Sequence, residues 1–514
     1  MSLIPNKRGF WLLRILYWYN SERRLWRFIK RWLKDEPSST SSGNNPVGIV
    51  ICTWFMNTVP WFSVALGLLL AKKNRDVVFI IDDMPFGSPL TEVKIQLGSI
   101  RRIAKLLSCR YKVVYVSDFF DKANFKKSKY EQVVSKLARL NAIHDLKAET
   151  KLDTDKGYQE LVKKQLARIY YAAWNMFENM SFDYLVLPGG ISSSSGIYLD
   201  LAKQKKLRAV TYDSDVGSLV ISTDGIATQV QDLPRLFEKL RVDREFEDIS
   251  IHEAAIELKK RQTGSDTLSF QACPSNENSV ATDKKSVLIP LNIGWDGAAL
   301  GIFTFYEGSI DYLVDTVRWI LQNSEHQIIV RQHPLERHEV YKSLDDFRSL
   351  LAREFPGNER IKFISADMAV NSYDLIKQVQ FVVVSTSTLG IEASMLGKPV
   401  ITPTNVYYSS LGFVFKASTR QEYLDLLRSA VRGELTVSEE MKRDAHKCYF
   451  LTQICNWFFT KFSPVSHYKE WIGLEPEDLW GQEDVQLVLA SIDENIPLPF
   501  LIYQRKLESE KKLT

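Results

Sequence analysis

Short runs of apolar, β-forming residues alternate with longer helical stretches along most of the chain. Five runs lie before residue 261, at 47–54, 76–83, 111–118, 182–190 and 207–215. Five more follow residue 285, at 286–294, 326–334, 361–365, 381–388 and 399–403. Nearly continuous apolar strands that alternate with helices, such as the one expected at 160–179, predict parallel sheets covered on both faces. Because the pattern occurs twice, it predicts two α/β domains.

Breaks in this pattern define the domain organisation. A polar segment separates the two cycles, and the linker-like sequence EPSSTSSGNNP precedes the first. We therefore expect two Rossmann-like domains facing a cleft, with an N-terminal basic amphipathic arm and a helical C-terminal tail. The expected segments are an arm at 1–36, a linker at 37–46, a first domain at 47–260, a linker at 261–286, a second domain at 287–439 and a tail at 440–514.

Charge is concentrated in the N-terminal arm. Residues 1–36 hold nine basic and three acidic side chains, a net charge of +6, which leaves −2 for the rest of a chain whose net charge is +4. A folded body without basic excess is not expected to bind nucleic acid.

The arm also carries an aromatic stripe at helical spacing, with a predicted break at Asn20-Ser21. The apolar run, interrupted by Arg14, is too short for a membrane span, and it lacks the cleavage site of a signal peptide. Aromatic and basic residues together favour a helix lying on an anionic membrane surface. The alternative is that the stripe packs on the protein's own surface or in a dimer. The stripe consists of Trp11, Ile15, Trp18, Glu22, Leu25, Ile29 and Trp32.

The stretch FVVVSTSTLGIEASMLGKPVI at 381–401 contains the strongest candidate site. An apolar strand runs directly into four hydroxyl side chains, Ser385, Thr386, Ser387 and Thr388, before a predicted helix that carries Gly390 and Glu392. Ligands of open parallel sheets bind beyond the carboxyl ends of the strands, where hydroxyls and backbone N–H groups suit phosphate oxygens. Glu392 could accept hydrogen bonds from a ribose diol. The alternative is helix capping, although Glu392 misses the capping-box position by one residue.

Two further strand ends of the second cycle add candidates. In RQHP, Pro334 ends a strand and so places His333 at the same sheet edge, where it could bind a phosphate or protonate a leaving group. Arg331 is either a phosphate ligand or a surface cation. In LNIGWDGAA, Gly294 allows close backbone approach, and Asp296 is either a helix cap or a sugar contact.

These motifs carry a resemblance. PLNIGWDGA, RQHP and STSTLGIEASMLGKPVI, in this order, resemble the nucleotide-sugar domain of GT-B glycosyltransferases, particularly the bacterial capsule polysaccharide biosynthesis group that includes the Kdo (3-deoxy-manno-octulosonate) transferases. The resemblance covers residues 286–405 well and the first domain only loosely. It implies donor-phosphate contacts from His333, Ser385, Thr386 and Ser387, and a ribose or base contact from Glu392.

The resemblance also implies a reaction. A sugar would move from a nucleotide-sugar donor, such as a CMP-Kdo-like one, to a lipid-linked or glycan acceptor in surface polysaccharide synthesis. The tail would cross back to the first domain. Enzymes of this group generally need no catalytic metal, so we expect neither a metal nor another cofactor.

Carboxylates at strand ends of the first domain are the acceptor-side candidates, because glycosyl transfer needs a base for the acceptor hydroxyl or a carboxylate at the anomeric centre. Asp213 and Asp215 follow a clear strand and are the expected catalytic pair, alongside His333. Turn formation is the alternative role. YDSD also imitates the metal-binding DxD motif of the other glycosyltransferase fold. The other strand-end carboxylates are Asp82, Asp83 and Asp118.

The spacing of the cysteines and histidines argues against a disulfide framework and against a zinc site. The five cysteines form no CxxC pair and the seven histidines form no HxxxH or HxH spacing, so neither a disulfide framework nor a zinc site is expected. We expect a cytoplasmic protein on the inner face of the cell membrane that could form homo-oligomers. Remaining alternatives are a nucleotide-sugar epimerase or hydrolase of the same fold, a polyol-phosphate transferase, and a non-catalytic nucleotide-sugar-binding partner.

Overall fold

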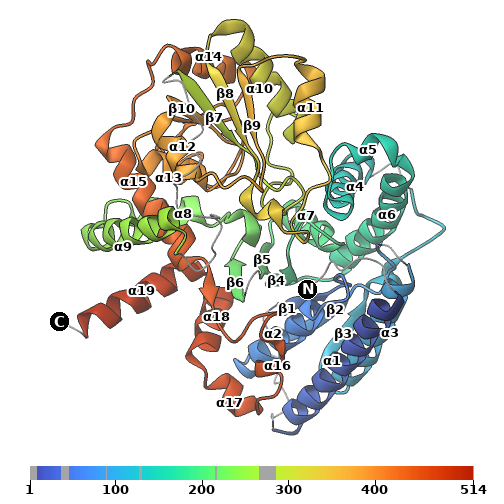
Figure 1. Cartoon of the computed structure of the whole chain (residues 1–514). Helices are drawn as coiled ribbons and strands as arrows, with labels where there is room; N and C mark the ends of the chain where they lie inside the picture. Colours follow the sequence, from blue (N-terminus) through green and yellow to red (C-terminus); the bar gives the residue numbers. More distant parts are fainter. Residues whose placement is uncertain are drawn as a thin grey trace. The chain divides into compact units, whose positions relative to one another are not determined.

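The structure is a computed structural model that describes residues 8–35, 45–87, 90–126, 130–214, 217–265 and 285–512. The chain forms two compact units, the elements of which are labelled in Figure 1. The first unit comprises residues 1–142, 153–232 and 455–514, and the second comprises residues 143–152 and 233–454. Most of the two expected linkers, residues 36–44 and 266–284, lies outside the described residues.

A mostly parallel sheet forms the centre of the first unit. Its order is β13-β6-β5-β4-β1-β2-β3, with β6 antiparallel to β5 and β13 antiparallel to β6. Every residue of β1, β2 and β4 is buried, as expected for strands covered on both faces. The strands are β1 (Val47–Ile51), β2 (Val77–Ile81), β3 (Lys112–Tyr115), β4 (Tyr184–Pro188), β5 (Arg208–Asp213), β6 (Ser218–Ser222) and β13 (Phe458–Phe459).

Helices pack on this sheet. The nearly all-apolar α2 packs on β1, β2 and β4, and at Gly67 it approaches so closely that a Cβ would meet the Phe79 ring at 2.4 Å. The helices and short helical turns are α1 (Arg8–Asp35), α2 (Val59–Lys72), α3 (Leu90–Leu107), η1 (Val116–Phe119), α4 (Glu131–Leu146), α5 (Lys151–Thr154), α6 (Lys156–Asn179), α7 (Ser195–Gln204) and η3 (Ala227–Gln229). The end of α4 and the start of α5, within residues 143–152, belong to the second unit.

The C-terminal tail belongs to the first unit from Cys455 onward. β13 extends the sheet at β6, and Trp471 packs its ring against Phe28, Phe62 and Phe462. The remaining tail elements are α16 (Tyr468–Trp471), α17 (Pro476–Trp480), α18 (Glu483–Glu494) and α19 (Leu498–Lys511).

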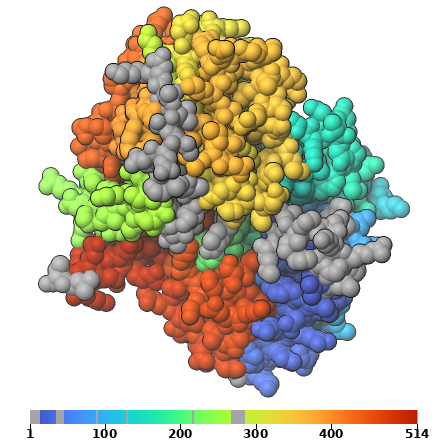
Figure 2. Space-filling view, viewed as in Figure 1, coloured from blue at the N-terminus to red at the C-terminus, as the bar shows by residue number. Residues whose placement is uncertain are grey.

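The N-terminal arm is one helix, α1, at the surface of the first unit (Figure 2, blue). The predicted break at Asn20-Ser21 is wrong, because Ser21 is buried and satisfied inside the helix: its hydroxyl donates to the Trp18 carbonyl and accepts from the Trp61 indole. The described part of the aromatic stripe faces the unit itself. Trp18 stacks on Trp61 at 4.6 Å between centroids, so own-surface packing, and not a membrane, accounts for the stripe.

The second unit has a sheet of the order β12-β11-β10-β7-β8-β9, with all neighbours parallel. Alternate strand residues such as Val287 and Ile289 form one core cluster with residues of α10, α11 and α14, while α12 and α13 lie on the other side of the sheet (Figure 1). The strands are β7 (Ser286–Pro290), β8 (Gln327–Arg331), β9 (Ile361–Ile364), β10 (Phe381–Val383), β11 (Val400–Thr402) and β12 (Phe415–Lys416).

The helices of the second unit begin before the expected boundary at residue 260. The helices and turns are α8 (Leu233–Leu240), α9 (Arg244–Thr263), α10 (Ser309–Asn323), η4 (Pro334–Arg337), α11 (Phe347–Glu354), α12 (Ser372–Gln378), α13 (Leu389–Met395), α14 (Arg420–Val431), α15 (Glu439–Tyr449) and the π-helical turn η5 (Phe450–Cys455). Thus α8 and α9, expected in the first domain, pack with the second.

Two further findings on the described residues concern the cysteines and the apolar character of the helices. Cys52, Cys109, Cys448 and Cys455 are free thiols, and Cys273 lies outside the described residues. Along the stretches the structure describes, none of the helices combines the length and apolar character needed to cross a bilayer.

Candidate functional site

The strand order of the second unit reverses between β7 and β10. The chain passes from β7 outward to β8 and β9, then returns to β10 and continues to β11 and β12 on the other side. Such a reversal leaves a crevice at the carboxyl ends of the two central strands, which is where open α/β sheets bind ligands. The loop after β7 and the hydroxyl cluster after β10 both lie at this point.

Asn292 joins these two loops. Its side-chain oxygen accepts from the Ser385 hydroxyl at 2.8 Å and from the Thr386 backbone N–H at 3.2 Å. The Ser385 carbonyl in turn accepts from Thr404 at 2.6 Å, so Ser385 is held on both sides. The Thr386 hydroxyl is buried and makes no hydrogen bond within the described structure.

The helix-capping alternative applies to part of the cluster. Thr388 is the N-cap residue of α13, but its side chain makes no capping hydrogen bond among the described residues. The Ser387 hydroxyl accepts from the Leu389 N–H at 3.3 Å instead. Gly390 serves the loop, because a Cβ there would meet the Tyr408 hydroxyl at 2.6 Å, and that hydroxyl donates to the Ser387 carbonyl.

A pocket opens beside this cluster. It brings together five residues predicted from the sequence, namely Arg331, His333, Ser387, Thr388 and Glu392. Gly294, Asp296, Ser385, Thr386 and Gly390 are not among the described residues that line it. The other lining residues are Arg261, Pro290, Leu291, Gln332, Pro334, Ser372, Tyr373 and Leu389.

His333 stands at the start of the turn that follows β8. Its Nδ1 accepts from the Leu335 backbone N–H at 3.3 Å. Removal of water around the ring, together with the nearby charge of Arg331, lowers the pKa of His333 to about 4. At neutral pH the ring is therefore uncharged and carries its proton on Nε2, where it can act as a hydrogen-bond donor.

Arg331 provides a positive charge in the pocket wall. It is 3% exposed and donates to the carbonyls of Ser365 and Val370. Burial, with a smaller effect of the Arg337 charge, lowers its pKa to about 10. Arg331 therefore stays charged at neutral pH, and its contacts to two loops fix where that charge lies.

Glu392 is held by a residue that sequence reasoning missed. Arg261, near the end of α9, pairs with Glu392 at 3.0 Å, and both side chains are buried. Burial lowers the pKa of Arg261, but the Glu392 carboxylate outweighs it and the net pKa is raised. Arg261 also donates to Gln453 at 3.0 Å. The carboxylate expected to bind a ribose therefore lies in an ion pair within the pocket wall.

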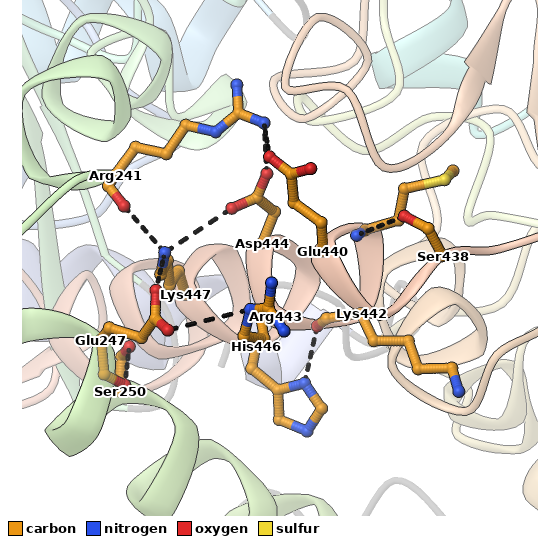
Figure 3. Close-up of polar contacts among 11 residues, drawn as sticks. Arg241, Glu247, Ser250, Ser438, Glu440, Lys442, Arg443, Asp444, His446 and Lys447 are labelled. Atoms are coloured by element: carbon orange, nitrogen blue, oxygen red, sulfur yellow. Dashed lines mark hydrogen bonds and ion pairs between the residues drawn. The ribbon is translucent and has the colours of Figure 1, made fainter. Parts of the chain in front are cut away.

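A second ion cluster fixes the helix that supplies Arg261 (Figure 3). Lys447 of α15 donates to Glu247 of α9 at 2.5 Å and to the Arg241 carbonyl at 2.7 Å. The Arg241 guanidinium pairs with Asp444 at 2.6 Å. α15 packs against both α9, which carries Arg261, and α13, which carries Glu392.

Asp296 has a local role in the turn after β7. Its carboxylate accepts from the Ala298 N–H at 3.3 Å within a turn. It does not cap a helix as expected, because the next helix along the chain, α10, begins only at Ser309. Among the described residues, no group of three or more His, Cys, Asp or Glu side chains could hold a metal ion.

The first-domain carboxylates lie at strand ends of the first unit. Asp213 ends β5 and accepts from the Ser214 N–H at 2.8 Å, while Asp215 lies outside the described residues. Asp83 is paired with Arg101 at 3.0 Å. Asp82 is 2% exposed, and burial raises its pKa to about 6 although hydrogen bonding from Ser194 and other groups opposes the shift.

Sequence reasoning missed Arg261 because nothing near it in the sequence marks it. It was placed in the polar linker, and its partner Glu392 lies 131 residues further on. Tyr373 is positioned by the Asn371 cap of α12, and its burial together with the Glu392 charge raises its pKa. Gln332, which also lines the pocket, lies within the RQHP motif, so its place at the end of a strand could have marked it as a site residue.

The fold and this pocket define an α/β protein with a ligand site at the strand reversal of its second sheet. Residues 255–434 match the family described as "Capsule polysaccharide biosynthesis protein". The matched segment contains every residue that lines the pocket. The resemblance to the capsule polysaccharide biosynthesis group is therefore confirmed over this part of the chain.

Solved structures with similarity to the chain include KpsC of Thermosulfurimonas dismutans, described as a β-Kdo 2,4-transferase. The identity is 18% with a TM-score of 0.35, over 52% of this chain and 79% of that one. UDP-GlcNAc 2-epimerase from Neisseria meningitidis bound to UDP-GlcNAc matches at 11% identity with a TM-score of 0.24, over 80% of this chain and 99% of that one. No curated protein matches the chain.

Proposed function

We propose that the protein is a glycosyltransferase of capsule polysaccharide synthesis and that the pocket of its second unit binds the nucleotide-sugar donor. The observation that carries the proposal is that every residue lining the pocket lies within the segment that matches the capsule polysaccharide biosynthesis family. The pocket combines a fixed positive charge, hydroxyl groups and an uncharged histidine, which suits a nucleotide diphosphate or monophosphate ester.

In this proposal the donor phosphate lies between Arg331, His333 and the hydroxyls of Ser387 and Thr388. The guanidinium offsets phosphate charge, and the His333 Nε2–H donates a hydrogen bond that strengthens as charge develops on the departing phosphate. Neutral His333 also avoids the cost of burying a second cation beside Arg331. The Ser385 hydroxyl and the Thr386 backbone N–H lie behind the lining and hold the loop through their hydrogen bonds to Asn292.

Glu392 is the proposed contact on the nucleoside side. Its pairing with Arg261 holds the carboxylate at the pocket wall in one orientation. A carboxylate fixed in this way can accept from a ribose diol without losing rotamer freedom on binding. Arg261 is thus a positioning residue for Glu392.

The finer features of the reaction belong to the same proposal. The donor is a CMP-Kdo-like nucleotide sugar, the acceptor is a lipid-linked or other glycan, and Asp213 and Asp215 of the first unit supply the acceptor-side carboxylates. Transfer follows the GT-B type without a metal, at the cytoplasmic face of the cell membrane. The donor, the acceptor and the metal-free GT-B type rest on the sequence resemblance. The two carboxylates rest on their place after a strand, and the location rests on the cysteine usage and the basic arm.

A panel of nucleotide sugars, each incubated with and without a lipid-linked glycan acceptor and analysed by mass spectrometry, tests the proposal. Acceptor-dependent release of free nucleotide together with a heavier acceptor supports it. Isomerised donor without acceptor indicates an epimerase, free sugar indicates a hydrolase, and a transferred polyol phosphate indicates the related transferase. Tight binding without turnover of any donor indicates a non-catalytic partner, and each of these outcomes contradicts the proposal.

A matched pair of histidine variants connects the activity to the pocket. His333→Ala removes the pocket imidazole, whereas His338→Ala removes an exposed imidazole a few residues along the same loop. Transfer that is lost in the first variant and kept in the second assigns the chemistry to the pocket.

A further inference from the structure

Helix α1 has an outward face that its packing on the first unit leaves uncovered. Large apolar side chains lie on this face, with Leu13 60% and Leu16 64% exposed. Tyr17, Tyr19 and Trp26 are each at least 40% exposed. A surface helix of a globular protein normally presents polar side chains on its outer face, so these residues need a separate explanation.

The outward face is also basic. Arg23, Arg27, Lys30 and Lys34 are exposed on it. The exposed apolar side chains lie mainly in the first half of the helix and the basic ones in the second half. Spacings of three, four and seven residues, such as Leu16 to Arg23 and Arg23 to Lys30, keep both kinds on one side of the helix. Lys30 lies over the Trp26 ring at 3.6 Å.

Acidic side chains do not offset this charge. Between residues 13 and 34 the helix contains one acidic residue, Glu22, and it points inward to pair with Arg102 at 2.6 Å. The basic residues at the edges of the helix are paired, Arg14 with Glu92 and Arg31 with Glu475. In the described part of the chain, Arg23, Arg27 and Lys34 form no ion pair.

The inner face explains why the outward face is rigid. Trp18, Leu25, Phe28, Ile29 and Trp32 are all buried in the first unit. The Trp18 indole donates to Ser99 at 2.8 Å, which fixes the rotation of the helix about its axis. The outward face is therefore presented in one orientation and does not depend on folding at a membrane.

We propose that the outward face of α1 docks the protein on an anionic lipid bilayer, with the helix lying in the plane of the interface. The basic side chains meet the lipid phosphates, Tyr17, Tyr19 and Trp26 lie at headgroup level, and Leu13 and Leu16 reach the acyl boundary. A duplex nucleic acid would match the charge but would leave the exposed leucines without a partner. The proposal assigns the inner stripe to packing and the opposite side to the membrane.

The inference goes beyond the proposed transferase function, because lipid binding needs no step of the sugar transfer. It gives the protein a surface for the membrane at which a lipid-linked acceptor would be found. Loss of one activity therefore leaves the other measurable.

Co-sedimentation of the full chain with vesicles tests the proposal. The wild type should bind vesicles of phosphatidylcholine and phosphatidylglycerol and should bind phosphatidylcholine alone far more weakly. Each basic residue near an anionic surface contributes about a fivefold gain in affinity. Replacement of Arg23, Arg27 and Lys30 by glutamine should therefore weaken binding roughly 100-fold, and added salt should weaken wild-type binding.

Two further variants separate charge from position. Leu13→Ser with Leu16→Ser should weaken binding at least tenfold while leaving the salt dependence in place. Lys156→Gln, Lys164→Gln and Lys203→Gln together remove the same charge from exposed positions elsewhere on the first unit, and this control should bind like the wild type. Unchanged circular dichroism and nucleotide binding exclude misfolding, because the altered side chains are exposed.

Several results would overturn the proposal. The wild type could fail to bind anionic vesicles, or the α1 variants could bind as well as the wild type. Equal losses in the control variant would indicate a general charge effect. Binding of a DNA duplex that the α1 charge variant alone abolishes would assign the surface to nucleic acid, and a change of sedimentation mass would assign it to self-association.

Discussion

Five parallel strands have the same order in the two sheets, β3-β2-β1-β4-β5 in the first and β9-β8-β7-β10-β11 in the second. The sheets differ in the side chains that lie where the strand order reverses. In the second unit the loops after β7 and β10 border a pocket with cationic and hydroxyl side chains. In the first unit the corresponding loops follow β1 and β4 and contact each other: the Trp54 ring lies 2.5 Å from where a Cβ on Gly189 would stand, and the Ser193 hydroxyl donates to the Thr53 carbonyl at 2.8 Å. Beside them is a buried carboxyl, Asp82, at the end of β2.

The difference shows that topology determines where loops meet, while side chains determine what the place can bind. Arginine, neutral histidine and hydroxyls suit a phosphate ester in the second unit. An acidic group with a raised pKa suits proton transfer and not phosphate binding in the first.

The buried pair in the pocket wall should give the largest effect on stability. Glu392→Ala leaves the buried Arg261 without its counter-charge, and loss of one partner of such a pair typically costs about 3–5 kcal/mol. Urea denaturation of the full chain measures the loss. Glu257→Ala on the same helix α9 breaks the more exposed pair with Lys260 at 3.3 Å and should cost less than about 1 kcal/mol. Equal costs in the two variants would contradict the account.

His333→Ala should give the largest effect on chemistry. Loss of one hydrogen bond that stabilises transition-state charge typically lowers the rate about 10²–10³-fold. Donor affinity, measured by calorimetric titration, should change much less, because the bond strengthens as the phosphate departs. A variant that binds the donor poorly but turns over normally would show that His333 acts in the ground state.

Asp82 should make the first unit less stable as the pH rises. Its pKa is about 6 in the folded protein against an ordinary 3.8, so the stabilising protonated form is lost as the pH rises through 6. At about 1.4 kcal/mol per pKa unit, the effect reaches at most about 3 kcal/mol. Asp82→Asn removes the dependence, and its stability relative to wild type should increase between pH ~4 and ~8.

Denaturation curves at several pH values provide that measurement. Asp118→Asn, in the exposed turn η1 of the same unit, is the control and should show no comparable trend. A wild-type stability that tracks the Asp82→Asn variant at every pH would mean that Asp82 titrates normally.

The smallest effect is expected on the pH dependence of donor affinity, which should be flat around neutral pH. Because the pKa of His333 is lowered to about 4, donor affinity should show no titration step near 6.5, the ordinary value for histidine. Calorimetric titrations across the neutral range check this. A step near 6.5 that disappears in His333→Gln would indicate that a charged imidazole binds the phosphate.

Much of the fold could be predicted from the sequence because buried parallel strands leave continuous apolar runs. Each of the ten expected runs contains a strand. β6 was missed because an antiparallel strand that follows a short hairpin lacks the strand–helix alternation, and β12 and β13 because two-residue strands leave no pattern.

Site residues could be predicted from the sequence only where polar or charged side chains directly follow a strand. His333 and Ser387 followed from that rule and line the pocket. Arg261 did not, because α9 brings it to Glu392 through tertiary packing that no local pattern records. The same limit applies to α1, where the stripe was visible but the surface it packs on was not.

Hydrogen–deuterium exchange of the full chain, with and without nucleotide sugars, follows the loops of both sheets in one experiment and therefore shows where the donor binds. A donor bound as proposed should slow exchange in the backbone at 331–335 and 385–392 of the second unit. The loops after β1 and β4, at 52–58 and 189–195, should change less. Slowing confined to the first-unit loops, or no slowing with any nucleotide sugar, would contradict the assignment of the donor site.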